Sequence, residues 1–285
     1  MKEFRRVLLI CMIIIIIIAT MQLVFYWNNY SISDDFYYEA NIISLDNFYN
    51  SEKNTFSGDT ISKTRFLYNV ISKKDEVLVI ENIFDVRKVT GERIFSVRRE
   101  YGIDQKTGKH VRGYGDKERS GYLFAPKNLK SKQSFAYWHV NYDAPAEMQF
   151  QGEEELLGLK VFRYEADYNA DQTANLAHLP GVPEKRGVIL DISLQTWIEP
   201  ITGRLIKYED NTVAYYYDIK TKERIEPWNK FHNKYTEASI KKQVNIASEE
   251  KLKILVFNKL IPMLIIIMAT LTIKLCTVAK NKHRK

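Results

Sequence analysis

Apolar and polar residues alternate with a period of two through the middle of the chain. Three successive runs show this alternation, at residues 66–70, 78–86 and 95–101. Turn-forming residues separate or follow the runs, at positions 72–75, 90–91 and 106–108. A period of two is typical of β-strands, so these residues predict an antiparallel meander of three strands.

The same pattern continues toward the C-terminus, where strands are expected at 135–140, 147–154, 159–168, 194–199, 205–210, 213–218 and 225–228. Several of these strands are apolar on both faces; Leu159 and Val161 lie on one side, with Phe162 and Tyr164 on the other. A sheet with one face in water needs only one apolar face. The fold class predicted is therefore mainly β: a curved antiparallel sheet that either curls toward a half-barrel or has its second face covered.

One tight return in this region makes a more specific prediction. Residues 200–203 read Pro-Ile-Thr-Gly and join two expected strands, so Gly203 should adopt a positive φ. Trp197 lies on the strand before the return. It is either a core residue or part of an open cleft for an apolar ligand.

Two long apolar segments lie near the ends of the chain. Residues 7–27 carry no charge, and residues 260–279 carry only Lys274. A helix of about 20 residues spans the roughly 30 Å hydrocarbon core of a bilayer, so both segments are expected to be transmembrane helices. The first is expected to be an uncleaved signal anchor, because its apolar run is too long for a signal peptide and Ala19-Thr20-Met21 is a poor cleavage site.

The charge distribution orients these segments. The net charge of +7 comes from the ends, because residues 28–250 hold 31 basic and 34 acidic residues. Basic residues flank both spans on the terminal sides, so both termini are expected in the cytoplasm and the main domain outside. A nucleic-acid partner is not expected, because the central domain carries no excess of basic residues.

These features predict a chain with one main domain outside the membrane. Thr236 is expected to cap a helix that continues to the membrane, and Pro262 to kink that helix. The cysteines, Cys11 and Cys276, both lie in the expected spans, so the domain needs no disulfide. The expected parts are a cytoplasmic tail at 1–6, a first span at 7–27, an extracytoplasmic β domain at 28–235, a juxtamembrane helix at 236–259, a second span at 260–279 and a tail at 280–285.

One segment has part of a calcium-loop pattern. Asp167, Asn169 and Asp171 stand two residues apart, as oxygen ligands do at the start of such a loop. Gln172 then replaces the glycine of the sharp turn, and His178 replaces the bidentate glutamate. A solvated polar loop over 167–186, the best candidate for a mobile loop, is the better interpretation.

The remaining chemistry-bearing residues also favour structural roles. They are the isolated histidines His110, His139, His178 and His232, the acidic run Glu153–Glu155, the glycines Gly113 and Gly115, and the aromatic run Tyr215–Tyr217. None has the spacing of a nucleophile–base pair, a zinc site or a phosphate loop. We therefore expect no catalytic, cofactor-binding or metal-binding residues and no enzymatic activity.

A family pattern extends over about residues 85–215. Its elements are Tyr101–Asp104, Thr107-Gly108, Gly115-Asp116, Arg119–Tyr122, Phe124–Pro126, Tyr137-Trp138, Phe150–Glu153, Gly158-Leu159, Phe162–Tyr164 and Trp197–Gly203. In this order, with an apolar segment near each end, they resemble the prokaryotic porin PorA-like membrane proteins. The resemblance implies an external β domain between two terminal helices. A lipid-embedded barrel is not favoured, because charges such as Arg98 and Arg163 lie on the strands.

Shorter stretches, Gly152–Tyr164 and Trp197–Gly203, also resemble the hairpins of bacterial lipoprotein carriers, in which a curved sheet holds acyl chains. The expected function is that of a membrane-anchored surface domain with a binding or structural role in the envelope. Its expected partners are the lipid bilayer, a bound lipid or envelope protein, and a second copy of the chain. The alternative is a component of an oligomeric channel, with Lys274 facing the pore.

Overall fold

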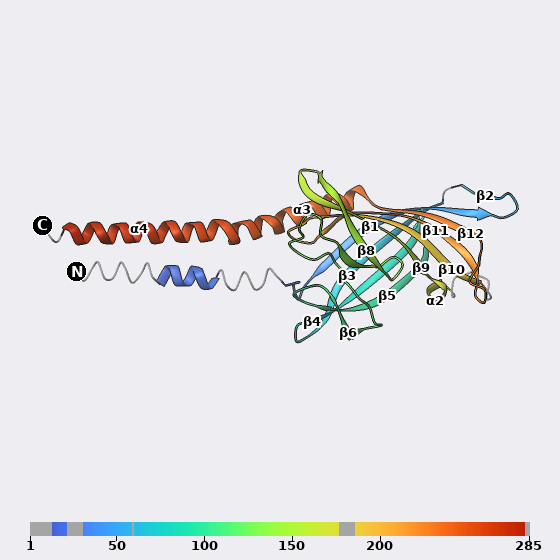
Figure 1. The fold of residues 1–285 in the computed structure, drawn as a ribbon, viewed down its shortest axis with the longest axis horizontal. Helices are drawn as coiled ribbons and strands as arrows, with labels where there is room; N and C mark the ends of the chain where they lie inside the picture. The colour runs from blue at the N-terminus through green and yellow to red at the C-terminus, as the bar shows by residue number, and fades with distance from the viewer. Residues whose placement is uncertain (1–12, 22–30, 59, 177–185, 283–285) are drawn as a thin grey trace. The chain divides into compact units, whose positions relative to one another are not determined.

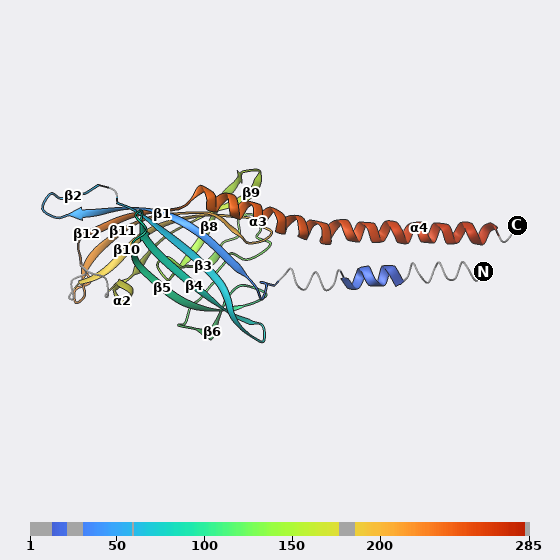
Figure 2. The same cartoon turned by 180° about the vertical axis from the view of Figure 1, so that it is seen from behind.

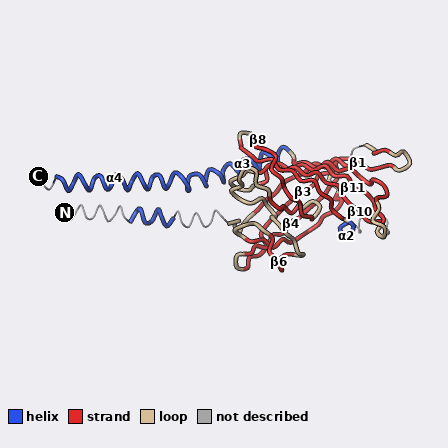
Figure 3. Tube along the Cα trace, viewed as in Figure 1, coloured by secondary structure: helices blue, strands red, loops and turns tan. Residues whose placement is uncertain are grey.

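The computed structural model describes residues 13–21, 31–58, 60–176 and 186–282. The chain divides into two units. One unit, Asp34–Ala247, contains the whole sheet; the other joins Met1–Ser33 with Ser248–Lys285. Figure 3 shows in red that strands make up most of the first unit.

Within the described residues the sheet has 12 strands, and each strand pair is antiparallel. The strands are β1 (Tyr37–Asn50), β2 (Thr55–Phe56), β3 (Thr60–Lys74), β4 (Val77–Lys88), β5 (Arg93–Asp104), β6 (His110–Gly115), β7 (Phe135–His139), β8 (Ala144–Leu156), β9 (Leu159–Asp171), β10 (Arg186–Ile198), β11 (Leu205–Asp218) and β12 (Arg224–Tyr235). Their order is β6-β5-β4-β3-β1-β12-β11-β10-β9-β8-β7, with β2 paired to β1. Pairing of β1 with β12 thus joins two meanders into one sheet. The fold is mainly β, as predicted.

One helical segment precedes the sheet in sequence, a short helix lies between β9 and β10, and the others follow the sheet. The helices are residues 13–21, α2 (Thr173–Leu176), α3 (Glu237–Leu255) and α4 (Ile261–Lys282), with a π-helical segment, η1 (Val256–Leu260), between the last two. Thr236 caps α3 as predicted, because its Oγ1 accepts a hydrogen bond from the Ser239 backbone N–H at 3.2 Å. The π-helical turn ends just before Pro262, which cannot donate a backbone hydrogen bond to the preceding turn.

The two predicted membrane spans are only partly covered by the structure. Residues 7–12 and 22–27 of the first lie outside the described residues. In the part of the chain that is described, no helix combines the length and the hydrophobicity that crossing a membrane requires. Both spans therefore remain predictions.

The sheet is strongly curved and twisted, and its two faces differ in burial. In Figures 1 and 2, strands β3, β4 and β5 cross the direction of β9, β10 and β11. Along β4 and β11 buried side chains alternate with partly exposed ones. We call the face with the buried side chains the inner face and the opposite one the outer face.

Aromatic side chains fill the inner face where the two meanders join. Tyr38 of β1 and Tyr235 of β12 share a hydrogen bond of 2.9 Å between their hydroxyl groups. Phe124, from the connection between β6 and β7, packs against Tyr38 and Tyr68 at ring-centroid distances of 6.1 and 5.4 Å. The cavity lined by these residues has a volume of about 20 Å³, which is about the space that one water molecule needs. This part of the core is therefore filled by the chain itself.

A buried ion cluster fixes the same connection to β5. The Asp143 side chain, 4% exposed, accepts hydrogen bonds from Arg119 Nε at 2.9 Å and Trp138 Nε1 at 2.7 Å. Lys117 Nζ lies 2.6 Å from the same carboxylate, and Arg99 Nε lies 3.6 Å away. Burial by itself would raise the pKa of Asp143, but these cations outweigh it and lower the pKa to about 2. Asp143 is therefore ionised at neutral pH.

Helix α3 covers the outer face at one end of the sheet. Val244 and Ala247 of α3 pack into a buried cluster with four residues of the sheet, Leu159, Val161, Trp197 and Ile206. Trp197 is 4% exposed, and its Nε1 donates a hydrogen bond to Glu154 at 2.7 Å. Trp197 is thus a core residue rather than part of an open cleft, which decides between the two alternatives raised by the sequence. Gly203 has φ +71°, as predicted.

Several strands differ from the sequence prediction. Strands β1, β2 and β6 were not predicted, β9, β10 and β12 extend further than expected, and β11 is one strand where two were expected. The predicted loop 167–186 begins within β9, continues into α2 and reaches β10, while its residues 177–185 lie outside the described part. In β11 and β12, polar residues such as Asp210, Asn211 and Asn233 interrupt the apolar alternation.

Candidate functional site

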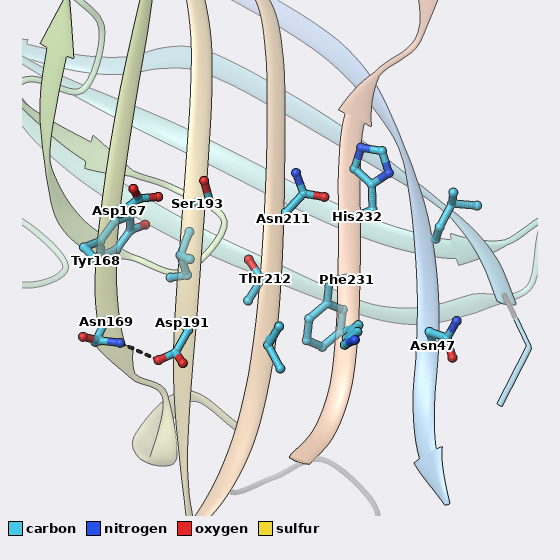
Figure 4. A pocket seen from close by; sticks show the side chains of 14 residues that line it. Asn47, Asp167, Tyr168, Asn169, Asp191, Ser193, Asn211, Thr212, Phe231 and His232 are labelled. Atoms are coloured by element: carbon cyan, nitrogen blue, oxygen red, sulfur yellow. Dashed lines mark hydrogen bonds between the residues drawn. The ribbon is translucent and has the colours of Figure 1, made fainter. Parts of the chain in front are cut away.

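A broad hollow lies across five neighbouring strands of the sheet, from β9 to β1. Its volume is about 740 Å³ (Figure 4). The strands are in register here, so that side chains from adjacent strands form straight rows across the outer face. The first row contains Asp167, Ser193, Asn211, His232 and Leu45, and the second contains Asn169, Asp191, Val213, Lys230 and Asn47.

The second row is held by polar contacts at its β9–β10 end. Asp191 accepts hydrogen bonds from Asn169 Nδ2 and from both terminal nitrogens of Arg224, each at 2.6 Å from the arginine. A bidentate guanidinium–carboxylate pair of this kind fixes the direction of both side chains. Lys230 is placed with its Nζ 4.1 Å from the centre of the Phe56 ring. The second row is therefore a preformed edge of the hollow.

The first row is different, because its central side chains have unused hydrogen-bonding groups. Asp167, Ser193 and Asn211 are exposed, and their side chains form no hydrogen bond with any described residue. His232, at the end of the row, has its Nε2 2.9 Å from Glu209 Oε1. Three neighbouring strands thus present a carboxylate, a hydroxyl and an amide to the hollow.

A buried polar cluster lies on the inner face of the same strands. At its centre is Asp210, a fully buried carboxylate on β11. It accepts hydrogen bonds from Asn233 Nδ2 at 2.9 Å, from the Tyr142 and Thr212 hydroxyl groups at 3.1 Å each, and from Tyr208. Burial raises the pKa of Asp210.

His139 extends the cluster toward β9. Its Nε2 is 2.6 Å from the Tyr208 hydroxyl, and its Nδ1 contacts the Tyr168 hydroxyl. Burial lowers the pKa of His139 to about 3, so that the imidazole is neutral at physiological pH. Tyr168 and Thr212 also contribute to the lining of the hollow. The cluster therefore ties the strands beneath the hollow to the segment that carries His139.

The three residues of the incomplete calcium pattern lie along one strand rather than around a loop. Asp167, Asn169 and Asp171 all lie on β9, where side chains two residues apart on one face are separated by about 6.6 Å. Asp171 accepts hydrogen bonds from Thr173 and from the Tyr217 hydroxyl at 2.6 Å each. Among the described residues there is no group of three or more His, Cys, Asp or Glu side chains that could hold a metal ion. His178 lies outside those residues.

The structure places the other residues considered from the sequence apart from one another. His110, with its pKa lowered to about 4 by burial, lies on β6, while His139 and His232 are on β7 and β12. Glu153 pairs with Lys160 at 2.5 Å, and Glu154 accepts the hydrogen bond from Trp197. Gly113 and Gly115 have φ of +80° and +86° on β6, and Tyr215–Tyr217 lie on β11. The hollow and the cluster around Asp210 were not predicted.

The fold and this surface define a class before any relative is considered: an antiparallel β-sheet protein with an open polar hollow on its outer face. The chain belongs to the family described as Porin PorA, whose model matches residues 118–276, more than half of its length. This confirms the resemblance inferred from the sequence and supports membrane association. The matched region contains β9 to β12 and so most of the hollow.

Two other comparisons add no functional information. No curated protein matches the chain. A solved structure, an acyl-CoA thioesterase II TesB2 from Mycobacterium marinum, aligns with 70% of this chain and 81% of its own at 10% identity and a TM-score of 0.13. A similarity this weak carries no argument about fold or activity.

Proposed function

We propose that this protein is a membrane-anchored binding protein of the cell envelope, and that its outer-face hollow is the binding surface. The observation that carries the proposal is the row of exposed Asp167, Ser193 and Asn211 side chains on a rigid sheet. Exposed polar side chains on a scaffold with a well-packed core can bind a ligand with little loss of conformational entropy.

The membrane anchor in this proposal rests on the sequence and on the family. Residues 7–27 and 260–279 have the length and composition of spans, and a porin family supports a location at the membrane. Basic residues at both ends favour cytoplasmic termini. The sheet then lies on the outer side of the membrane, where the hollow faces envelope components.

A binding role is preferred to catalysis because, among the described residues of the hollow, no serine lies within hydrogen-bond reach of a histidine. Ser193 and His232 share a row, but β11 lies between their strands. Strands are about 4.8 Å apart, which puts the two side chains about 10 Å from each other and beyond hydrogen-bond reach. The ligand is also not placed in the core, because the inner-face cavity of about 20 Å³ is far too small for an acyl chain.

Site-specific photo-cross-linking in intact cells tests this proposal. A photoreactive residue replaces Asn211 in the hollow, and a second variant carries it at Lys63, an exposed outer-face residue of β3 outside the hollow. We expect a discrete adduct from position 211 and none from position 63. Equal labelling at both positions, or no adduct at 211, would show that the hollow is not a binding surface.

Protease treatment of the same cells tests the topology. Added protease should degrade the β domain while short tags on either terminus stay protected. Cleavage of either tag from outside would contradict the proposed orientation.

A second function, as a channel component, is favoured by the family description as a porin and by a match that extends to residue 276, within α4. In this alternative several copies pack their helices around a pore, and Lys274 faces the pore. Planar-bilayer recordings of purified protein separate the two functions. Conductance that becomes more cation-selective in Lys274→Glu would support the channel function. Absence of conductance would argue against a channel, and the binding role would remain the proposed function.

A further inference from the structure

The chemistry of the hollow indicates which class of ligand it binds. Asp167 offers acceptors, while Ser193 and Asn211 offer both donors and acceptors, and all three are exposed. Sugar hydroxyl groups also donate and accept hydrogen bonds, so a glycan can satisfy every group of this row. An apolar ligand would bury these groups without hydrogen-bond partners, which is unfavourable.

The charges around the hollow disfavour strongly anionic ligands. Asp191 is neutralised by Arg224. Asp167 and Lys230 are of opposite sign, and His232 lies beside Glu209. A phosphate-rich polymer needs several Arg or Lys side chains directed at it, and the lining contains one lysine and no arginine.

The shape of the hollow fits an extended molecule that crosses the strands. The four polar side chains from Asp167 to His232 come from four adjacent strands, and at about 4.8 Å between strands they cover about 14 Å. Leu45 and Val213 lie in the same two rows and are half-buried, so that they can contact the C–H face of a sugar ring. The hollow thus combines a polar row with limited apolar contact.

From these observations we infer that the hollow binds a neutral or weakly charged glycan of the cell envelope, held by Asp167, Ser193 and Asn211. This inference rests on the binding role proposed above and specifies its ligand class. The glycan chain crosses β9 to β12 at right angles to the strands. Its hydroxyl groups hydrogen-bond to the first row.

Calorimetric titration of the full-length protein in a detergent without a sugar headgroup tests the inference. The probes are the hexamers of N-acetylglucosamine (β1,4), glucose (α1,4) and glucose (β1,4), with inorganic polyphosphate as the anionic comparison. We expect at least one neutral hexamer to bind and polyphosphate not to bind. Asn211→Ala should weaken that binding about 3- to 10-fold, and the Ser193→Ala/Asn211→Ala double variant about 10- to 100-fold.

Asn41→Ala is the matched control. Asn41 is an exposed asparagine on β1, on the same outer face but outside the hollow, so its variant should bind as the wild type does. Equal losses in Asn41→Ala and Asn211→Ala, or no loss in the double variant, would overturn the assignment of the site.

The cross-linking result separates failure of the ligand class from failure of the binding role. If no neutral hexamer binds while position 211 still yields a protein or lipid adduct in cells, the glycan inference is wrong and the binding role stands. If polyphosphate binds and Asn211→Ala abolishes its binding, the ligand class is wrong. If neither hexamers nor cellular adducts are found, both proposals fail.

Discussion

Trp197 should be a major stabilising residue of the sheet, because it joins α3 to the outer face. It is 4% exposed and packs with Val161, Ile206 and Val244. Replacing a buried tryptophan by alanine costs about 3–5 kcal/mol, through lost burial and the cavity that remains. The lost hydrogen bond to Glu154 adds little, because that carboxylate is 39% exposed and can be hydrated.

Thermal unfolding of the full-length protein in detergent, followed by circular dichroism in the strand region, measures this loss. A change of 1 kcal/mol shifts the Tm of a domain of this size by about 2–4 °C, so Trp197→Ala should lower the Tm by about 6–20 °C. Trp197→Phe, which retains a large apolar ring, should lower it by much less. Trp228 is only half-buried, so Trp228→Ala should also cost less.

A double-mutant cycle makes the test more specific. Val244 of α3 belongs to the same buried cluster, so Trp197→Ala and Val244→Ala should show a coupling of about 0.5 kcal/mol or more. A Tm for Trp197→Ala within 2 °C of the wild type would refute this account of the core. If the losses in the free energy of unfolding caused by Trp197→Ala and Val244→Ala simply add in the double variant, α3 does not pack on Trp197.

Three further predictions concern other parts of the fold. Gly203→Val should lower the Tm measurably, because Gly203 has φ +71° and an added Cβ would lie 2.4 Å from the Ala125 carbonyl oxygen; an unchanged Tm would contradict this. The pKa of Asp143 is lowered to about 2, so its ionised form stabilises the fold above pH 4, and about 2 kcal/mol is lost as the pH falls from 4 to 2. Urea unfolding at pH 6 and pH 2.5 should show a smaller difference for Asp143→Asn than for the wild type, and equal differences would rule this out. The unit Asp34–Ala247, expressed alone, should give a strand-dominated circular dichroism spectrum without disulfides; a random-coil or mainly helical spectrum would show that it does not fold independently.

Much of the fold could be predicted from the sequence because burial on one face of a strand leaves a period-two signal. The meander of β3, β4 and β5 alternates clearly, and its turns carry the expected residues. The cap at Thr236 and the positive φ of Gly203 are local features, set by a few neighbouring residues. Such features depend little on the rest of the fold and are therefore visible in the sequence.

The candidate site could not be predicted because it interrupts the same signal. Asp210, Asn211 and Thr212 form a polar run that indicates a turn, yet they lie in the middle of β11. Asp210 and Thr212 are buried, and Asp210 accepts hydrogen bonds from Tyr142 and Asn233, which are distant in sequence, while Asn211 faces the hollow. Strand pairing between distant segments creates both environments, so no local pattern could reveal them.

The pairing of β1 with β12 is the other feature that sequence periodicity could not predict. It places Asn47 and Leu45 beside Lys230 and His232, although about 185 residues separate them along the chain. The hollow is complete only with this pairing, since β1 provides its edge.

An experimental structure of the full-length protein, purified gently from its native envelope, tests the central claim most directly. The account predicts density for a co-purified ligand on the outer face, along the row formed by Asp167, Ser193 and Asn211 (Figure 4). The inner face should be filled by protein side chains. Ligand density between the two meanders on the inner face, with solvent in the hollow, would contradict it.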